Sequence, residues 1–344
     1  MTEEEKFCTI CIDGMALTPG LRYDCHSDRV VGFEDCGSKV GGRTSKIGNE
    51  FVAVWLKGVS SKWKQPIGHY LVHHSPGESR FSQILTECLA ATKRMGLSVC
   101  AIVCDQEPTQ WKSLKKLRCN SDQSAVNLKL SDESQVEVPV LIDVPHCIKN
   151  MRNALQKYAI EFDYNGKRMF ASWRDILVVA GLELAKPDQL RLVPKLRECH
   201  VNLTIGKKMS VKLAAQVLSR TMAHAIAVYS EYGLLSTPTA LGTAKFCELI
   251  NTLFDLTNNA AVFNSITTEN IHIKSEEIDS WIAWLSSLRF VKDDGRQFNG
   301  LSFHEGWQWS LKSLKAISKK LLHNAGCKSI LSRSFTQDYS KLQI

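Results

Sequence analysis

Hydrophobic positions in the first 150 residues fall into short runs bounded by polar or turn-forming residues. Such runs predict buried strands, because a strand covered on both faces carries apolar side chains throughout. The predicted strands are 7–12, 51–57, 66–72, 98–104 and 138–142. Two further runs, 21–24 and 30–34, flank the turn residues His26-Ser27-Asp28 and predict a hairpin. The first part of the chain is therefore expected to form a sheet.

Apolar residues three and four positions apart predict helices between these strands, and this spacing dominates after about residue 170. In the first part it predicts helices over 78–95, 108–117 and 147–158, whereas the polar stretch 120–137 is expected to be loop. The helices predicted later are 173–184, 210–232, 240–258, 276–288 and 310–325. The pattern indicates an α/β domain followed by an all-helical one.

Composition agrees with a folded protein of about two domains, given 344 residues and a usual domain size of roughly 100–200. The chain is 44% hydrophobic and 23% charged, which argues against a disordered chain, a coiled coil and a collagen. It lacks an apolar run of the roughly 18–20 residues that a membrane helix needs. Its acidic start is unlike a secretory signal. We therefore expect an intracellular protein whose 12 cysteines are reduced thiols.

Neither the cysteines nor the histidines form a convincing zinc site. Cys8 and Cys11 make a CxxC, but they lie in a predicted strand, where residues three apart point to opposite faces. No second CxxC or HxxxH follows at zinc-finger spacing. The cluster His69, His73 and His74 is also strand-like and has no further ligand nearby in the sequence. We therefore expect no zinc.

Three predicted strands are each followed at once by an aspartate, namely Asp13, Asp105 and Asp143. In α/β sheets, functional groups gather where strands end and loops separate. Carboxylates that converge there would form an oxygen-ligand site for Mg²⁺, and two such ions support in-line attack on a phosphodiester. An aspartate after a strand is also common as a turn former or helix cap, so each residue alone permits both interpretations.

The strings around these aspartates resemble the motifs of P-element-type DNA transposases, most closely the THAP-domain-associated, P-element-like transposases of animals. Asp105-Gln106 resembles the second acidic motif, and Cys11-Ile12-Asp13-Gly14-Met15 resembles the first. The segment 143–153 is similar to that family's D-x-P-H-x-x-K-x-x-R-N string. Further similar strings follow in the family's order over 190–196, 209–219, 241–244 and 254–258.

The resemblance implies an α/β RNase H-like domain interrupted by an all-α GTP-binding insertion. The expected ranges are 1–160 for the first catalytic part, 161–330 for the insertion and 331–344 for a truncated return to the catalytic domain. By resemblance, Asp13 and Asp105 are the catalytic and metal-binding residues, with Mg²⁺ as the metal. The residues expected to bind GTP are Asp143, Lys149, Asp255, Asn258 and Asp338. Because the chain has no GxxxxGK[ST] string, GTP would bind without a P-loop.

The family has a third carboxylate in a Q-D-x-L-E string, and this chain departs from it. Here the string begins at Gln337-Asp338 and then places Lys341 where the glutamate is expected. A cation at that position would repel metal ions. The resemblance therefore implies a transposase-derived protein with impaired catalysis. Two alternatives stay open: a domesticated GTP- or DNA-binding module without nuclease activity, or a fragment of an active transposase.

The expected partners are DNA and GTP, the expected location is the nucleus, and no membrane partner is expected. The chain also lacks the family's N-terminal DNA-binding module, so we expect only weak DNA binding through phosphate contacts. The candidate contacts are Lys112, Lys115, Lys116 and Arg118. A solvated helix face explains that cluster equally well. The net charge of +8 fits a nucleic-acid partner, but many enzymes carry a similar charge.

Overall fold

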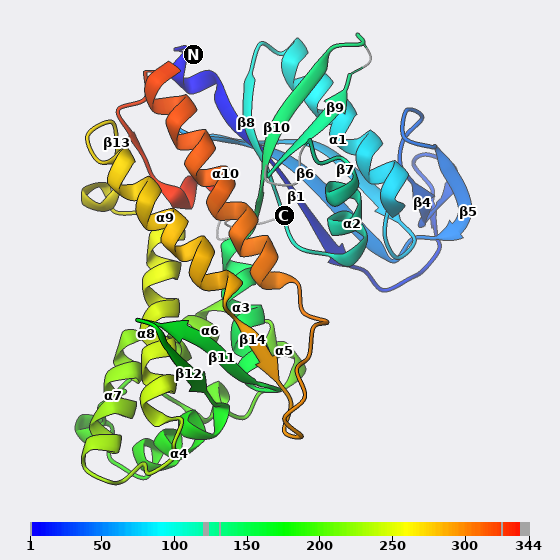
Figure 1. Ribbon diagram of the computed structural model, residues 1–344. Helices are drawn as coiled ribbons and strands as arrows, with labels where there is room; N and C mark the ends of the chain where they lie inside the picture. Colours follow the sequence, from blue (N-terminus) through cyan, green and yellow to red (C-terminus); the bar gives the residue numbers. More distant parts are fainter. Residues whose placement is uncertain (1, 120–123, 131, 325, 338–344) are drawn as a thin grey trace. The chain divides into compact units, whose positions relative to one another are not determined.

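The computed structural model describes residues 2–119, 124–130, 132–324 and 326–337. The chain divides into two compact units (Figure 1). Unit 1 contains Met1–Asp143, Ala260–His272 and Trp309–Ile344, and unit 2 contains Val144–Asn259 and Ile273–Gln308. One unit is therefore built from three separate parts of the chain. The predicted ranges 1–160, 161–330 and 331–344 stay a prediction, and the compact units change over at other positions.

Unit 1 is built on a mixed sheet with the order β5-β4-β7-β6-β1-β8-β10-β9 among the described residues. The antiparallel neighbours β6 and β7 lie on one side of β1, and β8 and β10 run parallel to β1 on the other. The strands are β1 (Phe7–Ala16), β4 (Phe33–Asp35), β5 (Arg43–Ile47), β6 (Glu50–Gly58), β7 (Lys64–Val72), β8 (Ser98–Cys104), β9 (Ala125–Lys129) and β10 (Gln135–Ile142).

The centre of this sheet is apolar on both faces, as the continuous hydrophobic runs predict. Helix α1 (Gly77–Arg94) covers one face and α10 (Phe303–Asn324) the other, with α2 (Pro108–Lys116) beside α1 (Figure 1). Cys11 and Val103 are fully buried in a cluster that includes Leu314 of α10. A central strand covered on both faces needs this composition.

The segment 120–137, expected to be loop, contains strand β9 and the first part of β10, so that prediction is wrong. Val126 and Leu128 are buried, whereas Asn127 and Lys129 are exposed. The alternation is that of an edge strand with one buried face, and five residues of it were too few to stand out from a polar stretch. β9 pairs antiparallel with β10, from Ala125↔Pro139 to Lys129↔Gln135.

Unit 2 is mainly helical and also carries a three-stranded sheet with the order β12-β11-β14. Its strands are β11 (Ala159–Tyr164), β12 (Lys167–Ala171) and β14 (Arg289–Val291). Its helices are α3 (Val144–Leu155), α4 (Trp173–Leu184), α5 (Ile205–Lys208), α6 (Val211–Val217), α7 (Arg220–Glu231), α8 (Ala240–Thr257) and most of α9 (Ile271–Ser286).

The helix predicted over 210–232 is two helices, so that expectation is corrected. α6 ends at Val217, and the hydroxyl of Ser219 accepts a hydrogen bond from the amide of Met222 at 3.2 Å to begin α7. A serine cap of this kind stabilises a new helix start where one continuous helix had been expected.

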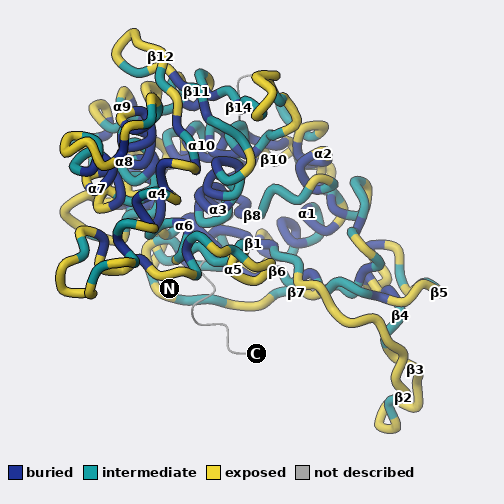
Figure 2. The backbone as a smooth tube through the Cα atoms, turned by 90° about the horizontal axis from the view of Figure 1, so that it is seen from below, coloured by how far each residue is buried: buried dark blue, intermediate teal, exposed yellow. Residues whose placement is uncertain are grey.

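Figure 2 shows that burial is uneven in unit 1, because the hairpin of β2 (Arg22–Asp24) and β3 (Arg29–Val31) extends away from its sheet and is mostly exposed. Tyr23 retains 58% of its accessible surface. Within the described residues, no helix is both long enough and apolar enough to cross a membrane.

Candidate active site

Asp13 lies inside β1, because the strand continues to Ala16 and is longer than predicted. On the side of β8, however, the last pair is Cys11↔Val103, so Asp13 lies beyond the end of that pairing. The side chain is half-buried. On one side, Asp13 is paired with Ala53 of β6. On the other side it lies past the last residue pair with β8, at the edge of the sheet where β8 and β10 end.

Asp105 follows the last residue of β8 and is half-buried. Its Oδ1 accepts a hydrogen bond from the amide of Glu107 at 3.1 Å, which shapes the turn after the strand. Glu107 then caps α2, since its Oε2 accepts from the amides of Thr109 and Gln110 at 2.9 and 2.8 Å. Two acidic residues thus fix the path from strand to helix at this edge.

Glu50, the first residue of β6, lies at the same edge of the sheet, and no motif in the sequence pointed to it. Burial is the largest cause that raises the pKa of its carboxyl group to about 7. The further causes are nearby negative charges, in decreasing order Glu107, Asp105 and Asp13. Like charges and partial desolvation both favour the protonated acid. The shift therefore reports that carboxylates from β1, β6 and the β8–α2 turn lie within electrostatic reach of one another.

Gly14 explains how Glu50 reaches over β1. A β-carbon added at position 14 would meet Oε1 of Glu50, so a larger residue there would require this carboxyl group to move. The motif Asp13-Gly14 thus supplies a carboxylate and, at the next residue, the space for a second one.

Asp143, expected to bind nucleotide, is 1% exposed and has a clear structural role. Its amide donates to the carbonyl of Cys104 at 2.8 Å, and its Oδ1 accepts from the amide of Gln337 at 2.8 Å. The side-chain amide of Gln337 also donates to the carbonyl of Ile12. Gln337 therefore connects the ends of β1 and β10, a role that only the folded chain reveals.

The segment before Gln337 is anchored along its length within unit 1. Strand β15 (Ser329–Ile330) pairs with β13 (Ile266–Thr267), and the Nζ of Lys57 donates to the carbonyls of Arg333 and Thr336 at 3.1 and 2.9 Å. We call the edge of the sheet where Asp13, Asp105 and Glu50 lie the carboxyl edge. The last part of the chain is thus held beside this edge up to Gln337. Asp338 and Lys341, named in the sequence predictions, lie outside the described residues.

Lys149, on α3 of unit 2, is 7% exposed. One turn earlier, burial and then the charge of Lys149 lower the pKa of His146 to about 4, so this imidazole is neutral at pH 7. The role of Lys149 as a nucleotide ligand stays a prediction.

Arg152 and Asn153, the R-N of the same string, hold α5 in place. Arg152 is fully buried, and its Nη2 donates to the carbonyl of Lys208 at 2.8 Å. The side-chain amide of Asn153 donates to the same carbonyl at 3.3 Å. These contacts give the two residues a structural function in unit 2 that sequence reasoning had not assigned.

The other two residues expected to bind nucleotide lie at the end of α8. Asp255 is exposed in the last turn and accepts a hydrogen bond from the side-chain amide of Asn251 at 2.7 Å. Asn258 caps the helix, with its amide bound to the carbonyl of Phe254 at 2.9 Å. The two residues are three positions apart at the end of one helix, so their side chains lie near each other. Their roles in binding the guanine base stay predictions.

The residues at the carboxyl edge fit a divalent metal in chemistry but incompletely in number. Asp13 and Asp105 offer the oxygen ligands that Mg²⁺ prefers. In the part of the chain that the structure describes, no group of three or more His, Cys, Asp or Glu side chains is close enough to hold a metal ion. A third ligand would have to come from outside those residues or after a rearrangement.

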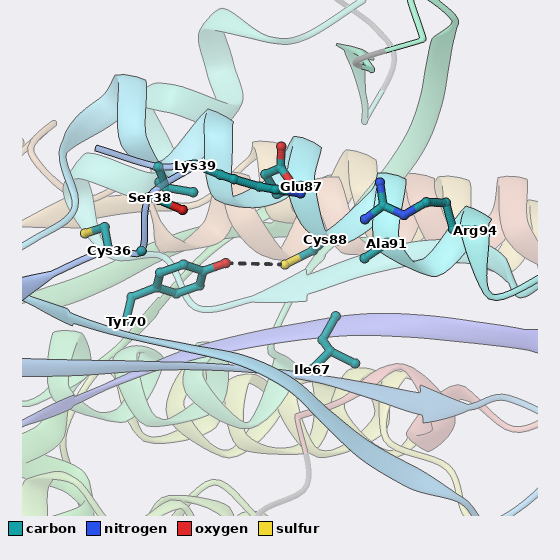
Figure 3. A pocket seen from close by; sticks show the side chains of 11 residues that line it. Cys36, Ser38, Lys39, Ile67, Tyr70, Glu87, Cys88, Ala91 and Arg94 are labelled. Carbon is teal, nitrogen blue, oxygen red and sulfur yellow. Dashed lines mark hydrogen bonds and ion pairs between the residues drawn. The ribbon is translucent and has the colours of Figure 1, made fainter. Parts of the chain in front are cut away.

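A cavity of about 360 Å³ lies elsewhere in unit 1, between the turn at 36–40, β7 and α1 (Figure 3). Tyr70 and Cys88 meet there at 3.9 Å, and Lys39 pairs with Glu87 at 3.3 Å. Its lining includes none of the carboxylates at the carboxyl edge. It is therefore separate from the candidate active site.

Two family models match the chain in the order that the fold requires. The TNP-like RNase H N-terminal domain matches residues 1–118, and the TNP-like GTP-binding insertion domain matches residues 145–270. Together they cover more than two thirds of the chain. The chain belongs to the P-element-like transposase family.

Two relatives of this transposase-family chain are each 25% identical to it. The human protein DNA transposase THAP9 matches over 258 residues, 74% of this chain and 28% of the relative. The Transposable element P transposase of Drosophila melanogaster matches over 340 residues, 98% of this chain and 41% of the relative. The chain thus spans less than half the length of either relative.

The fold is shared with a solved structure titled Drosophila P element transposase strand transfer complex. The TM-score is 0.75 at 22% identity, and the match covers 98% of this chain and 70% of that one. This confirms the expected fold class, an RNase H-like domain interrupted by a GTP-binding insertion. The expectation that the insertion is all-α is wrong, because its unit also contains the sheet of β11, β12 and β14.

Proposed function

We propose that this chain carries the DNA cleavage and joining chemistry of a P-element-like transposase, in impaired form, at the carboxyl edge of its sheet. The observation that carries the proposal is the placement of three carboxylates: Glu50 reaches over Gly14, next to Asp13, and Asp105 follows the end of the neighbouring strand β8. Asp105 and Asp13 also contribute to the raised pKa of Glu50, which supports one anionic site built from separate strands. Such a site suits phosphoryl transfer on DNA.

Asp13 and Asp105 would hold the divalent metal, which would activate a nucleophile and stabilise the leaving oxygen. The backbone amide of Glu107 donates a hydrogen bond to the carboxylate of Asp105, which holds the β8–α2 turn and positions that ligand. Burial and the neighbouring carboxylates raise the pKa of Glu50 to about 7, so this group could hold or release a proton beside the reacting phosphate.

Impairment follows from Lys341, which stands where the family resemblance places the third carboxylate. An ammonium group there would oppose metal binding instead of supporting it. We therefore expect Mn²⁺-dependent nicking of supercoiled DNA to stay at background for the 344-residue chain.

A matched set of variants tests this. Lys341→Glu is expected to produce Mn²⁺-dependent nicking, and adding Asp13→Asn or Asp105→Asn should return it to background. Adding Glu137→Gln, an exposed carboxylate on β10, should leave nicking intact. Nicking by the unchanged chain, or nicking in Lys341→Glu that survives loss of both aspartates, would contradict the proposal.

A second candidate function is GTP binding without nuclease activity, favoured by the match of the GTP-binding insertion domain. Lys149 would contact the phosphates, and Asp255 and Asn258 the guanine base. As a protein acting on DNA, the chain would work in the nucleus, with DNA and GTP as its partners.

A further inference from the structure

The part of α10 that belongs to unit 1 carries one sign of charge. Residues 309–324 contain four lysines and one histidine and neither aspartate nor glutamate. Leu311, Leu314 and Ile317 are buried. The basic residues lie at half-buried or exposed positions of the same segment: Lys312, Lys315, Lys319, Lys320 and His323. Because 312, 315, 319 and 323 follow helical spacing, they line one stripe of the helix.

Three of these lysines differ from several others in unit 1. Elsewhere, Lys39, Lys93 and Lys116 each pair with a carboxylate. Lys312, Lys319 and Lys320 form no ion pair with any residue that the structure describes. Lys319 and Lys320 are also exposed. Uncompensated like charges along a helix cost stability, so their concentration here indicates selection for an external anion.

The basic surface continues from α10 onto the end of α2. Trp111 and Trp309 pack edge to face at 4.7 Å between the two helices. The guanidinium of Arg118 lies over the ring of Trp309 at 5.4 Å, and the Nζ of Lys115 lies over Trp111 at 5.0 Å. The pair of indoles thus holds Lys115 of α2, and Arg118 just after that helix, beside the start of the lysine stripe. We call this set the basic track: Lys115, Arg118, Lys312, Lys315, Lys319 and Lys320.

We propose that the basic track binds the phosphodiester backbone of duplex DNA without sequence preference. At 1.5 Å per residue, the stripe from 312 to 323 is about 16 Å long. One strand of B-DNA places a phosphate every 3.4 Å along its axis, so the stripe spans roughly five phosphates. The charge pattern alone indicates a polyanion, and the choice of DNA rests on the proposed function.

The side chains around the track favour DNA over a membrane. A helix that lies in a membrane surface needs large apolar side chains beside its cations. Between the lysines of the stripe, the exposed position 316 is alanine, and the two indoles of the track are buried. A surface of ammonium groups with no apolar anchor is suited to phosphates in solution.

The test measures binding of a labelled random-sequence duplex by fluorescence anisotropy between 50 and 200 mM KCl. One variant replaces Lys312, Lys319 and Lys320 by glutamine. The control replaces Lys46, Lys62 and Lys167, exposed lysines on other parts of the chain, and so removes the same net charge. We expect the track variant to lower the slope of log K against log salt by about 3 and to weaken binding roughly tenfold or more. The control should change binding less than twofold.

Equal losses in both variants would mean that binding follows net charge and would overturn the proposal, as would an unchanged slope in the track variant. Poly-glutamate and phosphatidylserine vesicles are measured in parallel. If either binds as tightly as DNA at the same salt and loses that binding in the track variant, DNA is the wrong partner. The two proposals fail separately: absence of nicking by Lys341→Glu would count against the proposed function, whereas the anisotropy comparison keeps Lys341 and tests only the basic track.

Discussion

Glu50 shows how position in the sheet changes the chemistry of one side chain. Partial burial and three neighbouring carboxylates raise its pKa to about 7, above the ordinary value of 4.5. The folded state therefore holds a proton that the unfolded chain releases at lower pH. Stability from this proton is present at low pH and is lost as the pH rises through 7.

Glu50→Gln is therefore expected to raise the free energy of unfolding at pH 8, on the order of 1 kcal/mol, because it removes a charge that repels its neighbours. The expected gain is smaller than the free energy that corresponds to the full pKa shift, because the carboxyl group is partly exposed to solvent. At pH 4, below the ordinary pKa of 4.5, the gain should largely disappear because the carboxyl group is mostly protonated in both states. Urea unfolding at both pH values measures this, with Glu137→Gln as the control. An equal gain at pH 4 would show that charge is not the cause.

Gln337→Ala tests the connection between β1 and β10. The substitution removes the side-chain bond to the carbonyl of Ile12 but leaves the backbone amide bound to Asp143. We expect the free energy of unfolding to fall by about 1–2 kcal/mol, because a buried carbonyl loses its donor. Hydrogen exchange should also become faster in 329–337. No change in exchange would mean that Lys57 and β15 alone hold this segment.

At the scale of elements, α10 is joined to the sheet by serine hydroxyls as well as by apolar packing. Ser310 Oγ accepts from the amide of Ile142 at 2.7 Å and donates to its carbonyl at 2.8 Å. Ser313 Oγ lies 2.6 Å from the carbonyl of Val140 and 2.7 Å from Ser124 Oγ. A helix face that is polar at these positions can satisfy the edge of β10 without water.

Ser313→Ala should cost about 1–3 kcal/mol of unfolding free energy, because it leaves buried partners unsatisfied. The same helix offers the control, Ser318→Ala. The hydroxyl of Ser318 is fully buried and has no hydrogen-bond partner among the described residues, so its loss should be neutral or stabilising. Thermal melts of both variants measure the difference. Equal effects would mean that the contacts of Ser313 contribute nothing beyond packing.

Elements with a long, unbroken pattern could be predicted from the sequence. The strand Ser98–Cys104 and the helix Trp173–Leu184 are confirmed at both ends. β9 was missed because an edge strand shows its alternation only over a few residues. Glu50 and Gln337 were missed because their roles depend on neighbours far away in the chain. The local pattern predicts helices and strands. The composition of the site depends instead on the register of strand pairing, which places Glu50, and on the path of the segment 329–337, which places Gln337.

At the scale of the whole molecule, the insertion of one unit into the other separates two chemistries along the chain. The carboxyl edge lies in unit 1, and Lys149, Asp255 and Asn258 lie in unit 2. Each can therefore be tested with the full chain while the other is left intact.

Asp255→Ala should abolish GTP binding without affecting stability, because the side chain is exposed and makes one hydrogen bond, to Asn251. Calorimetry with millimolar GTP is expected to show heat for the unchanged chain, none with ATP and none for this variant. Glu231→Ala, an exposed carboxylate at the end of α7, is the control. Absence of heat with GTP in the unchanged chain would eliminate the nucleotide-binding proposal.

The three-part construction of unit 1 also sets the order in which the molecule can be made. Ile12 lies in the first strand, yet its carbonyl is bound by Gln337, so this contact closes only after everything between has been synthesised. Contacts this far apart in sequence form slowly, whereas unit 2 has its core within a shorter stretch. During translation the insertion can fold first, and the carboxyl edge is assembled last. A nascent chain would thus complete the core of unit 2 well before it completes the sheet edge where Asp13, Asp105 and Glu50 lie.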